Sequence, residues 1–541
     1  MKFLYDVNTK KLIIQEATKL EYNQVKIWLE REVENFRFTP AYRYNKWDGK
    51  IDLFKNGSIN FGLWKEIIAA LQIIGADFEV VNKKDFPLNR TVTLEHVQEF
   101  CNEFFKDRYI LDSNGNKKSF FPYEHQIDSA YKALRNRYSN LEVATSGGKT
   151  LVLSIIIFYI LKYIKSDAKI LLIVPSVQLV TQFYDDLLQF NTGSFKENLN
   201  PMDIRIQEIY GDKPRKWLGD GEPNMYISTY QSMSKIENFG EEFYKQFHTV
   251  IIDEAHMTKV ESIKKILNLT LDTAEYRFGV SGTFPKLDSA NWLTIESMTG
   301  PKVQQIRAKA LQDLGIITPI KIKCLHVNHN NPEIEEQLKK IRKNPNLGAE
   351  AYRLEGEFIR RSEKRISLIW KLINKVKSNT LILFNIIEYG TKIKETLEKE
   401  YIGYLERIKT DSTITEYKQY EFLYVDGDIS KKDRAEVKRK MELEDGIIRV
   451  LVASYGTFST GISINNIHNI ILAEGFKSEV RIIQSLGRSL RLHETKKQAL
   501  IFDIVDLLTE NGKGSYARQG DKRKTIYNEH QYPYDVIKID L

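Results

Sequence analysis

Eight residues from Val143 to Thr150 read Val-Ala-Thr-Ser-Gly-Gly-Lys-Thr and lead directly into an apolar run, Leu151 to Phe158. Small residues let backbone N–H groups approach a phosphate, and the start of a helix adds partial positive charge. In this pattern Lys149 reaches the β- and γ-phosphates of a nucleoside triphosphate, and the Thr150 hydroxyl coordinates Mg²⁺. The remaining contacts to the phosphates would come from Thr145, Ser146, Gly147 and Gly148. The usual pattern begins with glycine where this chain has Val143, so an ordinary loop before a core helix is the alternative.

An acidic pair follows a second apolar run about a hundred residues later. The run from Thr249 to Ile252 predicts a buried strand, and Asp253, Glu254 and His256 stand at its end. At that edge of a parallel sheet, the first carboxylate can hold the Mg²⁺ of the nucleotide and the second can polarise the attacking water. A surface loop is the alternative, but the position after an apolar strand and downstream of the phosphate loop makes the combination specific.

A pair of arginines forms the third candidate. The segment from Gln484 to Arg491 reads Gln-Ser-Leu-Gly-Arg-Ser-Leu-Arg, with Arg488 and Arg491 three residues apart on one helix face. Two guanidinium groups on one face repel each other unless an anion lies between them. We therefore expect them to reach the γ-phosphate from a second domain, which would couple hydrolysis to domain closure. A solvated basic helix is the alternative.

Short apolar runs that alternate with helical segments must position these side chains. They lie at 170–174, 225–228, 249–252 and 278–281, and again at 380–384, 422–425, 450–453, 469–472 and 499–502. Runs that end at small or polar residues in this alternation predict parallel sheets covered by helices on both faces. We therefore expect an α/β protein with two tandem parallel-sheet lobes and a small N-terminal α+β domain.

Changes in composition predict the domain boundaries. The expected parts are an α+β domain at 1–85, a connector at 86–120, a first lobe at 121–320, an exposed helical linker or insertion at 321–365, a second lobe at 366–510 and a basic C-terminal tail at 511–541. A chain of 541 residues is too long for one core, which agrees with this division.

Cations and aromatic residues alternate in the N-terminal domain between Phe36 and Lys50. Cations can hold phosphates and aromatic rings can stack on bases, so the stretch suits a nucleic-acid contact. The candidate contacts are Arg37, Arg43, Tyr44, Lys46, Trp47 and Lys50. A strand-rich core with a solvated basic face is the alternative.

Composition sets limits on the remaining function classes. A net charge of +8 permits a nucleic-acid partner without requiring one. Cys101 and Cys324 are far apart and lack ligand-spaced neighbours, which is typical of a reducing cytoplasm and indicates neither a zinc site nor a disulfide framework. The longest apolar run, Leu151 to Leu161, is too short to span a bilayer, and the N-terminus has no secretory pattern. We expect a cytoplasmic protein with no membrane partner.

Taken together, these motifs resemble those of the superfamily 2 helicases of the DEAH-type lineage over roughly residues 121 to 503. The resemblance implies two RecA-like lobes, ATP and Mg²⁺ as cofactors, and ATP-dependent helicase activity. It also implies that Lys149 and Thr150 serve the phosphates and Mg²⁺, that Asp253 holds the Mg²⁺, and that Glu254 activates water. His256 would link the nucleotide to the following motif, Ser281-Gly282-Thr283.

Other roles come from this resemblance alone. The segment from Phe120 to Gln126 resembles an adenine-binding motif, in which Gln126 contacts the base. Arg488 and Arg491 would be arginine fingers, with Gln484 in the same catalytic motif and Gly461 at the nucleotide. Three further motifs resemble strand-tracking segments, whose nucleic-acid contacts would be Ser176, Thr229 and Thr460.

A narrower resemblance comes from the N-terminal stretch and from residues 453–463, which are similar to bacteriophage helicases that remodel branched DNA. It implies branched or single-stranded DNA as the partner, in phage DNA replication, recombination and repair in the host-cell cytoplasm. It further implies a monomer that works with phage recombination or single-strand-binding proteins. Two alternatives stay open: a double-stranded DNA translocase that moves without separating strands, and a non-enzymatic DNA-binding or annealing protein.

Overall fold

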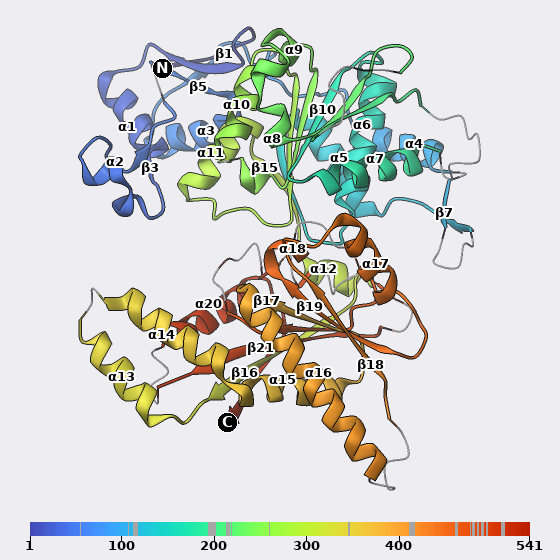
Figure 1. The fold of residues 1–541 in the computed structure, drawn as a ribbon. Helices are drawn as coiled ribbons and strands as arrows, with labels where there is room; N and C mark the ends of the chain where they lie inside the picture. Colours follow the sequence, from blue (N-terminus) through green and yellow to red (C-terminus); the bar gives the residue numbers. More distant parts are fainter. Residues whose placement is uncertain are drawn as a thin grey trace. The chain divides into compact units, whose positions relative to one another are not determined.

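The computed structural model describes residues 1–54, 56–106, 108–111, 117–192, 202–211, 217, 219–258, 260–344, 347–410, 417–459, 464–475, 478, 482–483, 486–487, 492–493, 496–509 and 514–541. These residues form two compact units. The first comprises residues 1–144 and 148–306, and the second comprises residues 145–147 and 307–541 (Figure 1).

The first unit is built on a seven-stranded parallel sheet in the order β11-β12-β10-β13-β14-β9-β15. The strands are β9 (Tyr138–Val143), β10 (Ile170–Val174), β11 (Ile206–Ile209), β12 (Met225–Thr229), β13 (Thr249–Asp253), β14 (Tyr276–Ser281) and β15 (Lys302–Ile306). Alternate residues of one strand join different cores, as Leu172 does on one face and Leu171 on the other. Both faces of the sheet are therefore buried, which explains the continuous apolar runs.

Helices cover the two faces of this sheet separately (Figure 1). One face packs against α4 (Leu94–Phe104), α5 (Glu124–Asn136), α6 (Lys149–Tyr159) and α7 (Val177–Thr192). The other face packs against α8 (Tyr230–Met233), α9 (Glu242–Lys245), α10 (Glu261–Leu269) and α11 (Ala290–Thr299). Since α4 packs into the first core, residues 86–120 are more than the connector that the sequence predicts. The hairpin of β7 (Tyr109–Leu111) and β8 (Lys117–Ser119) follows α4.

The second unit repeats this plan with a seven-stranded parallel sheet in the order β18-β19-β17-β20-β21-β16-β22. Its strands are β16 (Ile320–Asn328), β17 (Thr380–Phe384), β18 (Tyr420–Val425), β19 (Ile448–Ser454), β20 (Asn469–Leu472), β21 (Ala499–Leu507) and β22 (Tyr534–Asp540). Its helices are α12 (Ala308–Asp313), α13 (Pro332–Arg342), α14 (Gly348–Arg361), α15 (Glu363–Val376), α16 (Ile387–Thr410), α17 (Lys431–Met441), α18 (Tyr455–Ser459) and α20 (Ser515–Glu529). The predicted fold class, with two parallel-sheet lobes after a small N-terminal domain, is confirmed.

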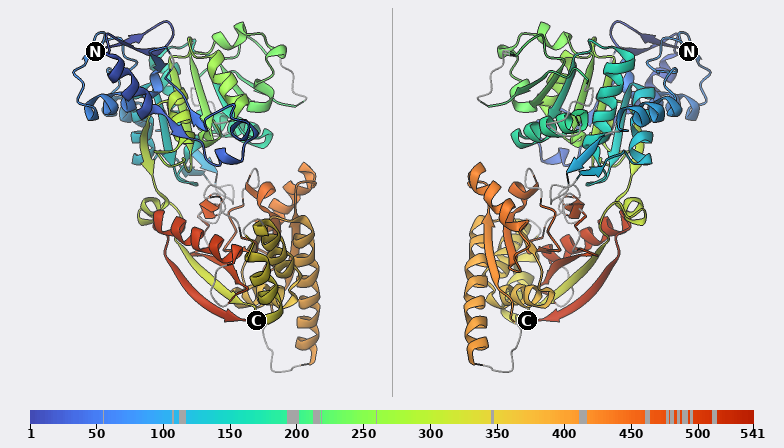
Figure 2. Two further views of the ribbon diagram at one scale, coloured as in Figure 1. Left: turned by 90° about the vertical axis from the view of Figure 1, so that its left-hand side faces the viewer. Right: turned by 90° about the vertical axis from the view of Figure 1, so that its right-hand side faces the viewer.

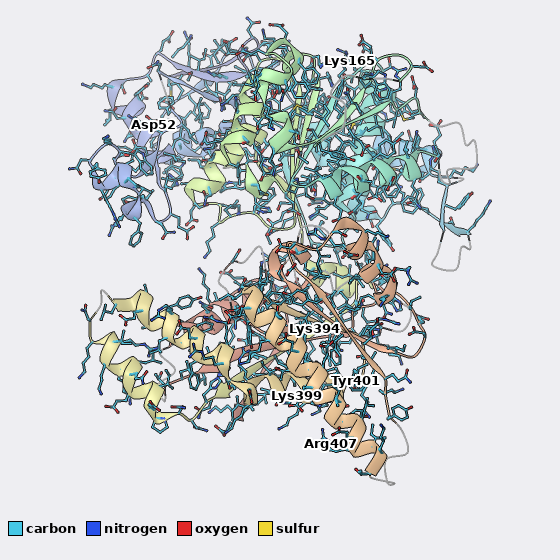
Figure 3. All side chains as sticks on the ribbon, viewed as in Figure 1. Asp52, Lys165, Lys394, Lys399, Tyr401 and Arg407 are labelled. Atoms are coloured by element: carbon cyan, nitrogen blue, oxygen red, sulfur yellow. The ribbon has the colours of Figure 1, made fainter. Side chains whose placement is uncertain are left out.

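An aromatic cluster lies where α16 packs against this second core. The ring of Tyr401 is 5.4 Å from that of Tyr420 and 6.2 Å from that of Trp370. Figure 3 shows Tyr401 on α16 together with the charged residues Lys394, Lys399 and Arg407. The helix therefore combines a packed aromatic side with charged positions along its length.

Two predicted segments of the second unit are wrong in detail. Residues 321–365 contain β16, which pairs with β21 and β22, so this part is a strand of the sheet followed by helices. The apolar residues of β16 alternate with lysines, which is a strand signal, but the mixed charge and helix-forming residues that follow dominate the composition of the segment. Residues 511–541 contain α20 and β22 rather than a basic tail (Figure 2). Arg523 of α20 is buried and bonds the carboxylate of Asp503 on β21, which explains why a basic segment packs inside.

Some of the charged residues in the 321–365 region are buried. Arg365 is fully buried and donates to both carboxylate oxygens of Asp506, at 2.7 and 2.8 Å, and to the carbonyl of Ala473. His329 Nε2 lies 2.9 Å from the same carboxylate. Since a buried charge is tolerated only when it is paired and hydrogen-bonded, this network places Arg365 in the core rather than on an exposed linker.

The N-terminal domain has a four-stranded mixed sheet in the order β5-β2-β1-β6. Its elements are β1 (Lys2–Asp6), β2 (Lys11–Gln15), α1 (Lys19–Leu29), β3 (Arg31–Glu32), α2 (Pro40–Arg43), β4 (Lys50–Ile51), β5 (Ser58–Asn60), α3 (Trp64–Ile73) and β6 (Glu79–Val80). Its core is shared with the first lobe, because Tyr138 of β9 and Leu293 of α11 belong to it. The two parts are therefore packed together.

Gly62 makes a close backbone contact with the first lobe at this joint. A Cβ at this position would lie 2.0 Å from the carbonyl oxygen of Glu296 on α11, which no real side chain tolerates. Glu296 is itself buried, and burial together with nearby Glu66 raises its pKa to about 8. The joint therefore depends on a residue without a side chain.

We expect Gly62→Ala to destabilise the protein by about 1 to 3 kcal/mol, since the added methyl overpacks a backbone contact. Chemical unfolding followed by tryptophan fluorescence measures the change. Gly403→Ala on α16 is the control, because no atom lies within 4 Å of a Cβ there and alanine favours a helix. A Gly62→Ala variant as stable as the wild type would contradict the close packing of the joint.

Candidate functional site

The candidate phosphate loop joins β9 to α6 and turns at two left-handed residues. Ser146 has φ +67° and Gly148, which immediately precedes α6, has φ +83°. A Cβ at Gly148 would also lie 2.1 Å from Gln126 Nε2, so conformation and space both require glycine there. Val143 is fully buried as the last residue of β9. Val143, which replaces the usual first glycine, is therefore a core residue of the strand. The residues that turn the loop are Ser146 and Gly148.

Lys149, the first residue of α6, meets the acidic pair at the end of β13. Its Nζ lies 3.3 Å from Glu254 Oε1, and both side chains are less than one-fifth exposed. Glu254 has φ +52°, a left-handed conformation that costs a non-glycine residue roughly 1 to 3 kcal/mol. The backbone thus turns sharply where the strand ends, with the Glu254 carboxylate beside the lysine.

His256 and Ser281 extend this cluster. His256 Nδ1 lies 2.9 Å from Ser281 Oγ and 3.3 Å from Glu254 Oε2. The Ser281 hydroxyl donates to the Thr283 carbonyl at 2.7 Å, which leaves its oxygen to accept from His256. We therefore assign the proton to Nδ1, from which it can reach both Ser281 and Glu254. The predicted link from the acidic segment to Ser281 is present as a hydrogen bond.

The two adjacent carboxyl groups have opposite electrostatic environments. Burial and the neighbouring charge of Glu254 raise the pKa of Asp253 to about 7. Burial acts in the same direction on Glu254, but Lys149 and His256 outweigh it and hold the Glu254 pKa well below its usual range. Glu254 is therefore ionised at neutral pH and available as a base.

Asp253 also fits a cation. Its Oδ1 is buried and has no hydrogen-bond donor among the residues that the structure describes. A hard divalent cation prefers a carboxylate oxygen of this kind, and Thr150 follows Lys149 at the start of α6. Asp253 is thus suited to a cation, and the joint role of Thr150 and Asp253 in holding Mg²⁺ stays a prediction.

Gln126 lies one turn into α5 and is almost fully buried. Its Oε1 accepts from the Tyr123 backbone N–H at 2.8 Å, and its amide nitrogen faces Gly148. The half-exposed Tyr123 ring is stacked against His125, with centroids 5.8 Å apart. This places an amide and an aromatic pair next to the phosphate loop, where a base could be recognised.

Two predicted strand-tracking hydroxyls cap helices. Val174 and Thr229 end β10 and β12 and are paired in register, so Thr229 and Ser176, two residues after Val174, lie at neighbouring strand ends. Ser176 Oγ accepts from the Leu179 N–H at 3.4 Å, and Thr229 Oγ1 accepts from the Ser232 N–H at 3.3 Å. Thr229 is buried, so phosphate contacts at this edge would come from backbone N–H groups as well as from Ser176.

The predicted nucleic-acid contacts of the N-terminal domain differ in their exposure to solvent and in their local contacts. Arg37, Arg43, Tyr44 and Lys46 are exposed. Trp47 is half-buried and donates its indole N–H to the Lys50 carbonyl at 2.7 Å. The Lys50 ammonium lies 3.3 Å from Glu30. Trp47 and Lys50 thus have polar partners within the domain, and the contact of all six residues with nucleic acid stays a prediction.

Five predicted residues lie outside the described part of the chain: Gln484, Arg488, Arg491, Thr460 and Gly461. Their roles stay predictions. The second unit also has a hollow of about 520 Å³ that the sequence does not predict, lined by Asn385, Ile387, Gly427, Arg434, Ser454, Gly456 and Thr457. It opens at the carboxyl ends of β17, β18 and β19, three strands whose predicted adjacency could have revealed it.

Known families match both lobes. Residues 117–286 match the family described as type III restriction enzyme, res subunit, and residues 364–493 match the helicase conserved C-terminal domain. Together with the two parallel sheets, these domains define the chain as a superfamily 2 helicase, an ATP-dependent enzyme. The predicted family and activity class are confirmed.

Within this class, the chain is 27% identical over 555 residues to the ATP-dependent DNA helicase uvsW of Enterobacteria phage T4, with 99% of each chain covered. The structure of an HsdR subunit of a type I restriction enzyme from Vibrio vulnificus YJ016 is 16% identical with TM-score 0.52, covering 91% of this chain and 78% of that one. The type ISP restriction-modification enzyme LlaBIII bound to DNA is 16% identical with TM-score 0.55, covering 80% and 32%. These two likenesses show the fold. Among the described residues, no helix is long and apolar enough to cross a membrane.

We expect Asp253→Asn to be more stable than the wild type in metal-free buffer, with the gain growing by roughly 2 kcal/mol from pH 5 to pH 8. The folded-state pKa of Asp253 lies above its unfolded value, so the ionised carboxyl costs stability as pH rises from about 4 through about 7. Urea unfolding at the two pH values measures the gain. Asp288→Asn, at an exposed site, is the control. A gain that does not depend on pH would overturn this view of the acidic pair.

Proposed function

We propose that the protein is an ATP-dependent DNA helicase that remodels branched DNA, such as forks and recombination intermediates, in phage DNA replication, recombination and repair. The observation that carries the hydrolytic part is the Glu254 carboxylate held between Lys149 and His256. Similarity to the uvsW DNA helicase over nearly the whole chain supports DNA as the nucleic acid. Arg37, Arg43 and Lys46, which are exposed and form no ion pair among the described residues, support a contact beyond the two lobes.

The residues of the first unit divide the chemistry of hydrolysis. Lys149 neutralises charge on the β- and γ-phosphate oxygens of ATP, and Gln126 contacts the adenine. Glu254, which Lys149 and His256 keep ionised despite its burial, takes a proton from the attacking water. His256 orients that carboxylate and connects it to Ser281 through the 2.9 Å hydrogen bond between His256 Nδ1 and Ser281 Oγ.

Mg²⁺ would be held by Thr150 and Asp253, and when bound it supplies charge neutralisation at the phosphate oxygens. We include Gln484, Arg488, Arg491 and Gly461 in the proposal as the second lobe's contribution. Arginines of this type stabilise the charge that develops on the transferred phosphoryl group.

The nucleic acid would be gripped at the carboxyl ends of both sheets. In the first unit this edge carries Ser176 and the helix start at Thr229. In the second unit this edge carries the hollow lined by Arg434, whose Nη2 donates to the Gly427 carbonyl at 3.1 Å. The proposal also includes Thr460 among the nucleic-acid contacts. Helix starts and arginines are suited to phosphate oxygens, so both edges fit a nucleic-acid backbone.

Several finer points belong to the same proposal. The protein would act as a monomer in the host-cell cytoplasm, with phage recombination or single-strand-binding proteins as partners. A double-stranded DNA translocase that leaves the strands paired is the second candidate, because the solved structures with this fold include restriction enzymes.

We expect Glu254→Gln to bind ATP with nearly unchanged affinity and to lose turnover by a factor on the order of 10² to 10⁴, since the amide keeps the shape but is not a base. Titration with a fluorescent ATP analogue and a phosphate-release assay measure the two quantities. Glu261→Gln, an exposed residue that starts α10, is the matched control. A collapse of ATP affinity in Glu254→Gln would make Glu254 a structural or metal-binding residue instead.

A second experiment addresses the nucleic acid. We expect branched DNA to stimulate ATP hydrolysis more than linear duplex or single-stranded DNA of equal length, and a strand-displacement assay to show unwinding of a fork. Lys149→Ala is the control and should lose hydrolysis while retaining DNA binding, because the phosphate site and the DNA grip use different residues. Stimulation without displacement would favour the translocase. DNA binding without any hydrolysis by the wild type would favour the non-enzymatic alternative.

A further inference from the structure

The N-terminal segment from Phe36 to Lys50 packs one pair of aromatic rings together and exposes another pair to solvent. Phe36 is buried, and Tyr42 packs edge-on against it with centroids 4.7 Å apart. Phe38 and Tyr44 are 71% and 74% exposed. Single exposed apolar side chains are common on protein surfaces. Here two exposed rings lie within seven residues of each other, in a segment whose other aromatic rings are packed. This arrangement indicates that a binding partner covers them.

Local contacts hold the segment so that Phe36 points inward. Thr39 Oγ1 donates to the Phe36 carbonyl at 2.7 Å and caps α2. Gly49 has φ +85°, and a Cβ there would lie 2.1 Å from the Phe36 ring. Gly49 thus packs closely against the Phe36 ring and holds that ring inside the domain. The rings of Phe38 and Tyr44, which end the two turns, face solvent instead.

The charges around these rings favour a polyanion. Arg37, Arg43 and Lys46 are exposed, and none of them forms an ion pair with a carboxylate among the described residues. Asp52, labelled in Figure 3, lies 3.7 Å from Lys26 instead. A protein partner would need acidic residues for three cations and apolar pockets for two rings, whereas nucleic acid supplies phosphates and base faces together.

We propose that Phe38 and Tyr44 stack on base faces exposed where a DNA duplex branches, while Arg37, Arg43 and Lys46 hold the flanking phosphates. In a continuous duplex every base face is covered by its neighbour, so cations alone bind it and the rings gain nothing. At a branch point the terminal base pairs have free faces. The inference rests on the proposed function, because it names the feature of branched DNA that the N-terminal domain reads.

The test compares the full-length wild type with Phe38→Ala/Tyr44→Ala in binding to a three-way junction and to linear duplex of equal length. Stacking lost from one or two bases should weaken junction binding about 10-fold to 100-fold and leave duplex binding unchanged. The dependence on salt should stay the same, because no phosphate contact is removed. Leu20→Ala/Ile27→Ala removes two equally exposed apolar side chains of α1 and should change neither affinity.

Two further variants separate the contributions. Arg37→Ala/Arg43→Ala/Lys46→Ala should weaken binding to both DNAs and reduce the salt slope by about one unit for each cation. Phe38→Trp/Tyr44→Trp should restore the preference for the junction. In the wild type, 2-aminopurine beside the branch should change its fluorescence on binding, and the alanine variant should not produce this change.

Equal losses on junction and duplex, or an unchanged junction affinity, would overturn the inference. So would a wild type that binds the two DNAs equally. If the wild type unwinds forks and the double alanine variant keeps its junction preference, only this inference fails. If DNA does not stimulate hydrolysis by the wild type, the proposed function fails, whatever the binding assay shows.

Discussion

The first unit depends on a physical conflict at the end of β13, where two adjacent carboxyl groups are buried side by side. An isolated buried carboxylate costs several kcal/mol, and a second one beside it adds repulsion. Lys149 and His256 compensate Glu254, which leaves Asp253 with a buried oxygen that has no donor among the described residues. The buried Asp253 oxygen therefore destabilises the site, and a bound cation would remove this cost. This fits a nucleotide site better than a structural ion pair, because full pairing would satisfy both groups.

The parallel sheet makes this arrangement possible. Asp253 is paired in register with Val280 on β14, so Ser281 comes one residue further along the neighbouring strand. Gly279 permits the close approach of the surrounding elements, because a Cβ there would lie 2.0 Å from Asn140 Oδ1 and 2.9 Å from Ala255 Cβ. Strand order and one glycine thus bring Ser281 to the histidine that follows the acidic pair.

Much of this could be predicted from the sequence, since the apolar runs of the central strands and the residues at their ends carry local signals. Strand β16 carries the alternating pattern of a half-buried strand, but it stands before a long charged segment whose composition indicates helices. Helix α20 is not predicted because its basic composition conceals Arg523, which is buried against Asp503. The sequence also does not predict that the Trp47 indole N–H donates to the Lys50 carbonyl. Whether a polar side chain is buried or pairs with a particular partner depends on contacts between residues that are distant in the sequence. No local sequence pattern predicts those contacts.

The N-terminal domain is an integral part of the first unit rather than a tethered module. Tyr138 and Leu293 lie in its core, and Phe61 packs against Tyr138 with centroids 5.5 Å apart. Removal of residues 1–85 would expose these side chains and leave the buried Glu296 without its cover. Activity lost in such a truncation would therefore reflect lost packing as well as lost DNA contacts. Exposed side chains such as Arg43 and Tyr44 contribute nothing to that core, so replacing them separates the binding of DNA from the stability of the motor.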